Sequence, residues 1–170
     1  ETWVHEIKTP IASTRLIIEN NQNAITRNIQ DEIKKIEGYI EQVLYYSRSN
    51  NVSKDYLIKE VSLPDLVRNV IKRNSRDFIS KGIMVDMEAV EGMAYSDAKW
   101  LEFIVNQLIG NAIKYTRERD GKVTIHTTRN ENNIELTIED NGIGIIDKDL
   151  NRIFEKGFTG ENGRKFGGST

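Results

Sequence analysis

The stretch NQLIGNAIKYT (106–116) decides the fold, because it predicts one helix with two different faces. Ser96 or Asp97 can cap the start of this helix, and the helical pattern runs to about Arg117. We expect a buried side that consists of Leu101, Ile104, Val105, Leu108 and Ala112. The opposite side is left for polar residues.

A polar stripe runs along that other side of the helix. Gln107, Asn111 and Lys114 are spaced by four and three residues, so they share one face. An amide oxygen is a hard ligand that suits Mg²⁺, and a lysine one turn further can meet a phosphate. For the stripe taken alone, a solvated helix face is the simpler explanation.

The stretch DNGIGI (140–145) directly follows a strand pattern. Asp140 can accept a hydrogen bond from an exocyclic amine such as that of adenine, while Gly142 and Gly144 allow close backbone approach or positive φ. A tight turn is the alternative. The dinucleotide-binding pattern is excluded, because it needs a third glycine that opens a helix, and residues 146 and 147 are isoleucine and aspartate.

The last stretch, IFEKGFTGENGRKFGGST (153–170), is rich in glycine and mixed in charge. Phe154 and Phe158 are candidate hydrophobic anchors. Such a segment can form a mobile cover over a nucleotide, or it can be a disordered tail. Composition favours neither.

The second part of the chain predicts an α+β fold, an α/β sandwich with helices on one face of a mixed sheet. Pro64 begins an amphipathic helix that runs to about Ser80. Strand patterns occur at 59–63, 83–89, 122–128 and 133–140. The last two alternate apolar and polar residues and predict a hairpin with one buried face.

The first part of the chain predicts a helical hairpin with a turn in ENNQNAIT (19–26). Its second helix carries an apolar stripe at steps of three and four: Ile25, Ile29, Ile33, Ile36, Ile40, Val43 and Leu44. Two such helices cannot bury both of their stripes alone, so we expect a homodimer through residues 1–50 that forms a four-helix bundle. The alternative is a hairpin that packs on its own chain. Residues 51–57 are expected to be a linker and 58–170 a second domain.

Composition narrows the function classes. The formal net charge of −2 argues against a protein that grips nucleic acid through a broad basic face. The absence of cysteine excludes disulfides and thiolate metal sites. No apolar run approaches the roughly 18 residues of a membrane span. Both ends interrupt a pattern, so we expect a piece of a longer protein.

The order of the motifs, rather than any one of them, resembles the sensor histidine kinases of bacterial two-component systems. NAIKYT matches the N box, DNGIGI the G1 box, and the Phe-anchored glycine-rich stretch the F box and the start of the G2 box. HEIKTP (5–10), upstream in a helical hairpin, matches the phospho-acceptor H box. The resemblance implies a fold of the histidine-kinase/Hsp90/gyrase ATPase type after a dimerisation and phosphotransfer hairpin.

The resemblance also implies roles in the hairpin. His5 would accept the phosphoryl group, Glu6 would take its proton or orient the ring, and Thr9 would help to dephosphorylate a response regulator. Pro10 lacks an N–H, so the helix would bend one turn after His5. Replacing Pro10 by alanine is expected to straighten the helix and shift the ratio of kinase to phosphatase activity. An unchanged ratio would contradict this hypothesis.

For the second domain the resemblance implies ATP and Mg²⁺ as cofactors. Asn111 would ligate Mg²⁺, Lys114 and Tyr115 would meet the phosphates, and Asp140 would read the adenine amine. Other residues expected around the nucleotide are Gln107, Gly142, Gly144, Phe154 and Phe158, with charge added by Lys156, Arg164 and Lys165.

Three departures from the family pattern bear on this prediction. Gln107 stands where related ATPases of the Hsp90 and gyrase type carry a glutamate base, which argues against simple ATP hydrolysis. Gly157 replaces a second aromatic residue of the F box. The G2 box stops at Thr170, so we expect the C-terminal end of the domain to be missing.

WVHEIKTP and FEKGFTGENGR together resemble the branch that senses cell-envelope antibiotics such as bacitracin. This implies the cytoplasmic portion of a bacterial membrane protein, partnered by a response regulator and an ABC transporter. Two other functions remain open from the sequence. One is a serine kinase of the anti-sigma-factor type, against which the HEIKTP hairpin argues. The other is a dimeric scaffold that binds nucleotide without transfer.

Overall fold

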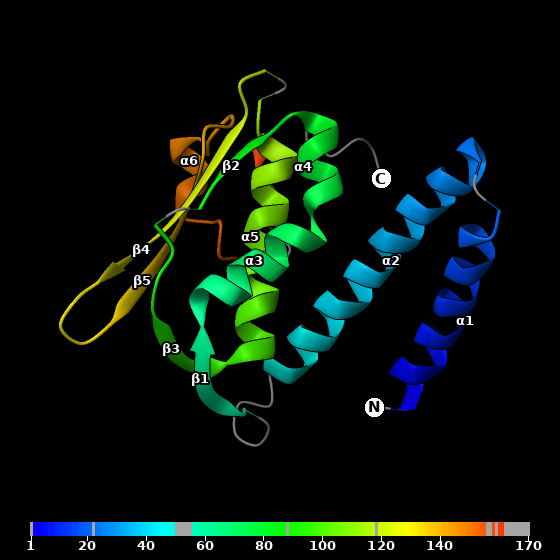
Figure 1. Ribbon diagram of the computed structural model, residues 1–170, viewed down its shortest axis with the longest axis horizontal. Coiled ribbons are helices and arrows are strands. Elements are labelled where there is room, and N and C mark those ends of the chain that lie inside the picture. Colours follow the sequence, from blue (N-terminus) through cyan, green and yellow to red (C-terminus); the bar gives the residue numbers. More distant parts are fainter. Residues whose placement is uncertain are drawn as a thin grey trace. The chain divides into compact units, whose positions relative to one another are not determined.

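The computed structural model describes residues 2–21, 23–49, 56–87, 89–117, 119–155, 158, 160 and 161. The chain divides into two compact units, Glu1–Tyr56 and Leu57–Thr170 (Figure 1).

The first unit is a hairpin of helices α1 (Thr2–Glu19) and α2 (Ala24–Ser49). The side chains of Asn23 and Thr26 cap the start of α2 reciprocally, since each accepts a hydrogen bond from the other's backbone N–H, at 2.9 and 2.8 Å. Among the residues of this unit whose burial is described, Ile18 and Ile33 are the buried apolar ones. α1 runs through Pro10 without ending. Within the described parts of the chain, no helix has the length and apolar character that crossing a membrane requires.

The second unit contains two small sheets and their helices (Figure 1). Its elements are β1 (Ile58–Ser62), α3 (Leu63–Arg73), α4 (Ser75–Lys81), β2 (Met84–Asp86), β3 (Met93–Asp97), α5 (Ala98–Tyr115), β4 (Lys122–Arg129), β5 (Ile134–Asp140) and α6 (Asp147–Leu150). β1 pairs antiparallel with β3, while β4 pairs parallel with β2 and antiparallel with β5. The predicted α+β class with a mixed sheet is therefore confirmed.

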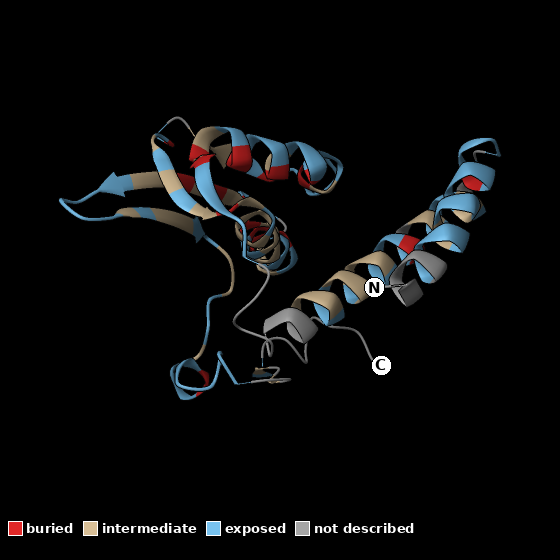
Figure 2. Cartoon of the chain, turned by 90° about the horizontal axis from the view of Figure 1, so that it is seen from below, coloured by how far each residue is buried: buried red, intermediate tan, exposed pale blue. Residues whose placement is uncertain are grey.

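The core of this unit lies between helices α3 and α5 and the strands. Its fully buried side chains are Val67, Val70, Val105, Ile109, Val123 and Ile125. Figure 2 shows buried positions, in red, on the helices that lie beside the strands. Within this unit α6 lies apart from α3 and α4, beyond the end of β5 (Figures 1 and 2).

The buried side of α5 differs in part from the prediction. Ile104 and Leu108 are 47% and 48% exposed, while Ile109 and Ile113 are buried beside Val105 and Ala112. The apolar residues of this helix spread over more than half of its circumference, so the sequence pattern alone did not fix which edge faces the core.

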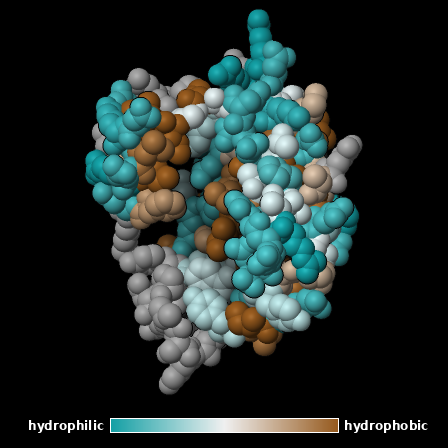
Figure 3. Space-filling model, turned by 90° about the vertical axis from the view of Figure 1, so that its left-hand side faces the viewer, coloured by the Kyte–Doolittle hydropathy of each residue, from teal (hydrophilic) through white to brown (hydrophobic). Residues whose placement is uncertain are grey.

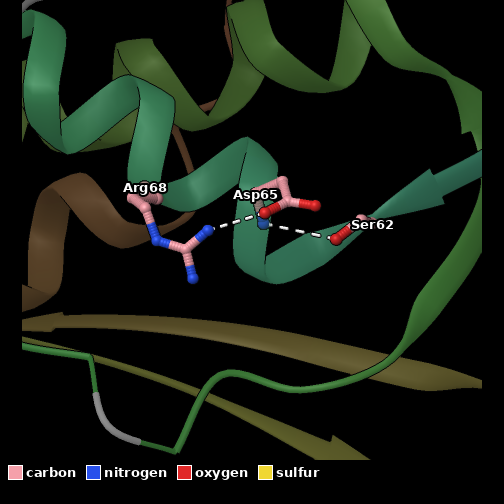
Figure 4. Close-up of polar contacts among 3 residues, drawn as sticks. All are labelled: Ser62, Asp65 and Arg68. Atoms are coloured by element: carbon pink, nitrogen blue, oxygen red, sulfur yellow. Dashed lines mark hydrogen bonds and ion pairs between the residues drawn. The ribbon is translucent and has the colours of Figure 1, made fainter.

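The first turn of α3 is held by side chains (Figure 4). Ser62 is the N-cap and accepts a hydrogen bond from the Asp65 backbone N–H at 3.3 Å. Asp65 in turn contacts the Arg68 guanidinium at 2.6 Å. Hydrogen bonding to Ser62 and then to Arg68 lowers the pKa of Asp65. The predicted helix start at Pro64 is confirmed to within one residue.

The single helix predicted to reach Ser80 is instead two helices that break at Asn74. The Asn74 side chain is buried and donates to the Val70 carbonyl at 2.9 Å and to the Asn106 side-chain oxygen at 2.8 Å. Asparagine competes with helical hydrogen bonding in this way, and so it ends α3 although the apolar period continues. β3 was not predicted.

Candidate functional site

A pocket of about 370 Å³ lies where the end of α5, the end of β5 and helix α6 meet. The face that carries α6, β4 and β5 is hollowed beside a group of hydrophobic residues, coloured brown in Figure 3. The lining residues are Asn111, Lys114, Tyr115, Asp140, Gly144, Ile145, Ile146, Asp149, Ile153, Phe158 and Gly160. One part of the lining is polar and charged, and the other is aliphatic and aromatic.

Helix α5 supplies the polar part from its last two turns. Asn111 and Lys114 are exposed and Tyr115 is half-buried. The Lys114 ammonium lies 5.1 Å from the centroid of the Tyr115 ring, a cation–π contact that holds the two together. Asn111 and Lys114 therefore present an amide and a cation to the same cavity.

Both ends of α5 are fixed by charged side chains from elsewhere. At its start the buried Asp97 carboxylate accepts hydrogen bonds from the backbone N–H groups of Lys99 (2.9 Å), Trp100 (3.1 Å) and Leu57 (3.0 Å). Near its end the Lys81 ammonium, which extends from α4, donates to the Ile113 carbonyl at 2.7 Å. These caps match the helix macrodipole, with the anion at the N-terminus and the cation at the C-terminus.

Burial opposes ionisation of Asp97, but the three backbone hydrogen bonds and the nearby Lys99 charge outweigh it. The net result is a lowered pKa for Asp97. The cap is therefore an ionised carboxylate at neutral pH.

The loop after β5 packs directly on the end of α5. The Ile143 N–H donates to the Tyr115 carbonyl at 3.1 Å, and the Gly142 N–H donates to Asp140 Oδ1 at 2.9 Å. A Cβ atom at Gly142 would lie 2.5 Å from Asp140 Oδ1 and closer still to the Tyr115 carbonyl oxygen. Gly144 has φ of +66°. Glycine at 142 is therefore required by close approach and at 144 by backbone conformation.

Asn141, between these site residues, ties the loop to the start of β4. Its side-chain oxygen accepts the Lys122 N–H at 2.8 Å, and its amide donates to the Asp120 carbonyl at 2.6 Å. Its own N–H donates to the Lys122 carbonyl at 3.2 Å. One asparagine thus connects two segments that flank the pocket.

The pocket unites most of the residues predicted to meet a nucleotide. Those in its lining are Asn111, Lys114, Tyr115, Asp140, Gly144 and Phe158, and Gly142 lies directly behind them. Gln107 is outside the lining, and Phe154 is outside it and 94% exposed. A nucleotide contact of either residue stays a prediction.

The roles of several other predicted residues stay predictions. The side chains of His5 and Glu6 lie outside the described residues, as do Lys156, Arg164 and Lys165. Thr9 is exposed on α1.

Five lining residues were missed by the sequence prediction: Ile145, Ile146, Asp149, Ile153 and Gly160. Ile145 is the last residue of DNGIGI, Ile146 follows it, and Ile153 comes three residues after the end of α6. No local pattern marks these five residues, because the pocket forms only where segments distant along the chain come together.

The lining suits a ligand with one flat apolar end and one anionic end. Isoleucines and Phe158 offer apolar contact, Asp140 offers an acceptor, and Lys114 offers a cation. Asn111 provides an amide oxygen of the kind that hard cations accept. Within the described residues, no group of three or more histidine, cysteine or acidic side chains forms a metal cluster.

Residues 96–170 match the family model described as the histidine kinase-, DNA gyrase B- and HSP90-like ATPase. The sensor histidine kinase YxdK of Bacillus subtilis is 36% identical over 169 residues, which are 99% of this chain and 52% of YxdK. The sensor protein BceS of the same organism is 34% identical over 158 residues, which are 92% of this chain and 47% of BceS. The chain thus spans about half the length of these relatives.

Solved structures share the fold at lower identity. ShkA, crystallised at full length with AMPPNP, aligns with a TM-score of 0.64 and 24% identity over 91% of this chain and 35% of its own. The histidine kinase ThkA, in complex with the response regulator protein TrrA, aligns with a TM-score of 0.60 and 18% identity over 93% of this chain and 48% of its own.

Proposed function

The chain belongs to the sensor histidine kinases, and on that premise we propose that its second unit binds ATP and transfers the γ-phosphoryl group to His5. The observation that carries this proposal is the pocket that brings Asn111, Lys114 and Asp140 together beside an apolar wall. The AMPPNP complex of ShkA, which has the same fold, supports a nucleotide as the ligand.

The pocket residues suggest how ATP is held. Asp140 accepts a hydrogen bond from the adenine amine, the isoleucines contact the base, and Lys114 contacts the phosphates. Asn111 is the residue that would hold Mg²⁺, together with phosphate oxygens, as is usual for this ion. When bound, Mg²⁺ neutralises charge on the phosphates.

In the transfer step an imidazole nitrogen of His5 forms a bond to the γ-phosphorus as the bond from that phosphorus to the bridging oxygen breaks. Glu6 takes the proton that the imidazole releases, and ADP leaves. Gln107 cannot act as a base for water, so transfer to His5 is favoured over hydrolysis.

The phosphoryl group then passes from His5 to an aspartate of a response regulator. The complex of ThkA with TrrA supports a partner of this class. Thr9, exposed one turn after His5, would orient the water that removes the phosphoryl group from the regulator in a separate phosphatase reaction.

The hairpin supports a homodimer as the working unit. On α2 Ile29, Ile36 and Val43 lie seven residues apart and are 43%, 48% and 54% exposed, although Ile33 is buried against α1. A seven-residue apolar seam outside the hairpin fits a second copy of the hairpin in a four-helix bundle.

Similarity to BceS supports a narrower assignment. We infer that the chain is the cytoplasmic portion of a membrane kinase that responds to cell-envelope antibiotics such as bacitracin and works with an ABC transporter.

The test is incubation of a version of the protein extended past Thr170 with Mg-ATP labelled on the γ-phosphate. We expect label on the protein that is lost in acid and stable in base, and that disappears in His5→Ala. His126→Ala is the matched control, because the chain has only two histidines and His126 lies on β4.

Other outcomes select other functions. Acid-stable label that persists in His5→Ala would indicate a serine kinase of the anti-sigma type. Bound nucleotide without any label would indicate a scaffold.

A further inference from the structure

The described residues after α6 fold back onto this helix through several contacts. Asp149, on α6, is a carboxylate only 8% exposed, and it lines the pocket. Its Oδ2 accepts a hydrogen bond from the backbone N–H of Glu161 at 2.9 Å. Lys148, the neighbouring residue, pairs with the Glu161 side chain. One turn of helix therefore holds a backbone segment twelve residues further along the chain.

Gly160 is part of the same arrangement. A Cβ atom at this position would lie 2.7 Å from Asp149 Oδ2, so the backbone passes against the carboxylate as only glycine allows. Gly160 also lines the pocket. Because Gly160 has no side chain, its backbone has room to lie beside the Asp149 carboxylate.

The Arg152 guanidinium adds a further contact on the same side. It lies 4.3 Å from the centroid of the Phe158 ring and forms a 3.0 Å hydrogen bond with Glu155. Phe158 is another lining residue. The pocket-lining residues Phe158 and Gly160 and the neighbouring Glu161 are thus held by α6 and the turn that follows it. These three residues are one wall of the pocket.

We propose that Asp149 is a positioning residue that holds Gly160 and Glu161 of this wall in place and thereby slows the release of bound nucleotide. The carboxylate acts through the backbone of Gly160 and Glu161, so its effect reaches the nucleotide through the shape of the wall. This inference rests on the proposed function, since it takes ATP as the ligand of the pocket.

The physical argument is that a buried carboxylate with a backbone N–H partner makes a strong, charge-assisted contact. If Asp149 is removed, the Glu161 N–H loses its acceptor and the wall loses its link to α6. The wall would then open more often, and nucleotide would leave by that side.

The test is the release rate of a fluorescent ATP analogue, mant-ATP with Mg²⁺, from the full-length protein, measured by chasing with unlabelled ATP. Asp149→Ala is expected to speed release by about tenfold, the size expected for losing one hydrogen bond to a charged group. Asp149→Asn keeps an oxygen that can accept the Glu161 N–H, so it should restore part of the slow release. Asp147→Asn is the matched control, because it removes an exposed charge from the same helix outside the pocket lining.

Gly160→Ala tests the contact from its other side. In the wild-type background the new Cβ meets Asp149 Oδ2, and release should speed up. In the Asp149→Ala background that clash is absent, so the same change should have much less effect. Melting temperatures measured without nucleotide should be close to wild type for all of these variants, which separates positioning from a folding defect.

The outcomes are distinguishable. If wild type does not bind mant-ATP, the proposed function is wrong and this inference falls with it. If wild type binds mant-ATP but Asp149→Ala releases it as slowly as Asp147→Asn, only the positioning role is overturned. The same conclusion follows if the effects of Asp149→Ala and Gly160→Ala on the release rate are simply additive.

Discussion

At the scale of single residues, Asn141 shows how the site depends on a side chain that the ligand need not touch. Its two side-chain hydrogen bonds join the loop after β5 to Asp120 and Lys122, which lie about twenty positions earlier in the sequence. The sequence predicted Asp140, Gly142 and Gly144 because their roles are local to one motif. It missed Asn141 and Asp149 because their partners are distant along the chain.

We predict that Asn141→Ala weakens nucleotide binding and lowers the free energy of unfolding of the second unit by about 1 kcal/mol, since water can replace part of the lost hydrogen bonding. Titration with mant-ATP and chemical denaturation would measure the two effects. Asn132→Ala, at the exposed tip of the β4–β5 hairpin, is the control and should change neither quantity. If the two variants behaved alike, Asn141 would not hold the loop after β5 in place.

At the scale of elements, α5 is the helix on which the site depends, and it is fixed at both ends. Its boundaries were predicted well because Asp97 is a strong N-cap and Thr116 follows the last apolar residues. β3 was missed because its residues, MAYSD, do not alternate between apolar and polar side chains. Its place is set by pairing with β1 and by the Leu63 N–H, which donates to the Gly92 carbonyl at 3.1 Å.

We predict that the stabilisation by the Asp97 cap depends on pH. The pKa of Asp97 is lowered on folding, so its contribution is present in full above the unfolded value of about 3.9 and is lost as pH falls through the folded pKa. Asp97→Ala should therefore cost about 1–2 kcal/mol of unfolding free energy at pH 7.

The difference between Asp97→Ala and wild type should shrink as the pH is lowered below about 4. Urea denaturation across that range would measure it, with Glu131→Ala at an exposed hairpin position as the control. A difference that stays constant with pH would show that the ionised carboxylate is not the stabilising form.

The opposite end of α5 gives a second prediction at this scale. Lys81→Met removes the cation that caps the Ile113 carbonyl and should cost about 1 kcal/mol, with weaker ATP binding because Asn111 and Lys114 lie in the same turns. Lys81→Arg keeps a cationic donor and should recover most of both losses. Loss of stability without any change in ATP affinity would limit Lys81 to a structural role.

At the scale of the whole molecule, the hairpin and the second unit differ in how far they bury their own apolar residues. The hairpin leaves an apolar seam outside its own fold, whereas the second unit buries a continuous core. The sequence predicted the seam from its period, but a single chain cannot reveal what covers it. What covers the seam is a property of the assembled dimer.

We predict that Ile29→Asp combined with Ile36→Asp converts a dimer to monomers, because charges in the seam would have to be buried without partners. Sedimentation equilibrium would measure the mass. Asn28→Asp, on an exposed position of the same helix, should leave the dimer intact. A double variant that still sediments as a dimer would place the interface elsewhere.

The sheet of the second unit has its own bearing on how the protein behaves in solution. Among the described strands, β5 pairs with β4 along one side and forms the edge of the β2–β4–β5 sheet. Exposed sheet edges invite other chains to add a strand, and charged side chains on the edge discourage it. β5 carries Glu135, Glu139 and Asp140 at exposed positions, so two copies that met edge to edge would bring like charges together. We therefore expect concentrated solutions at neutral pH to resist aggregation through this edge.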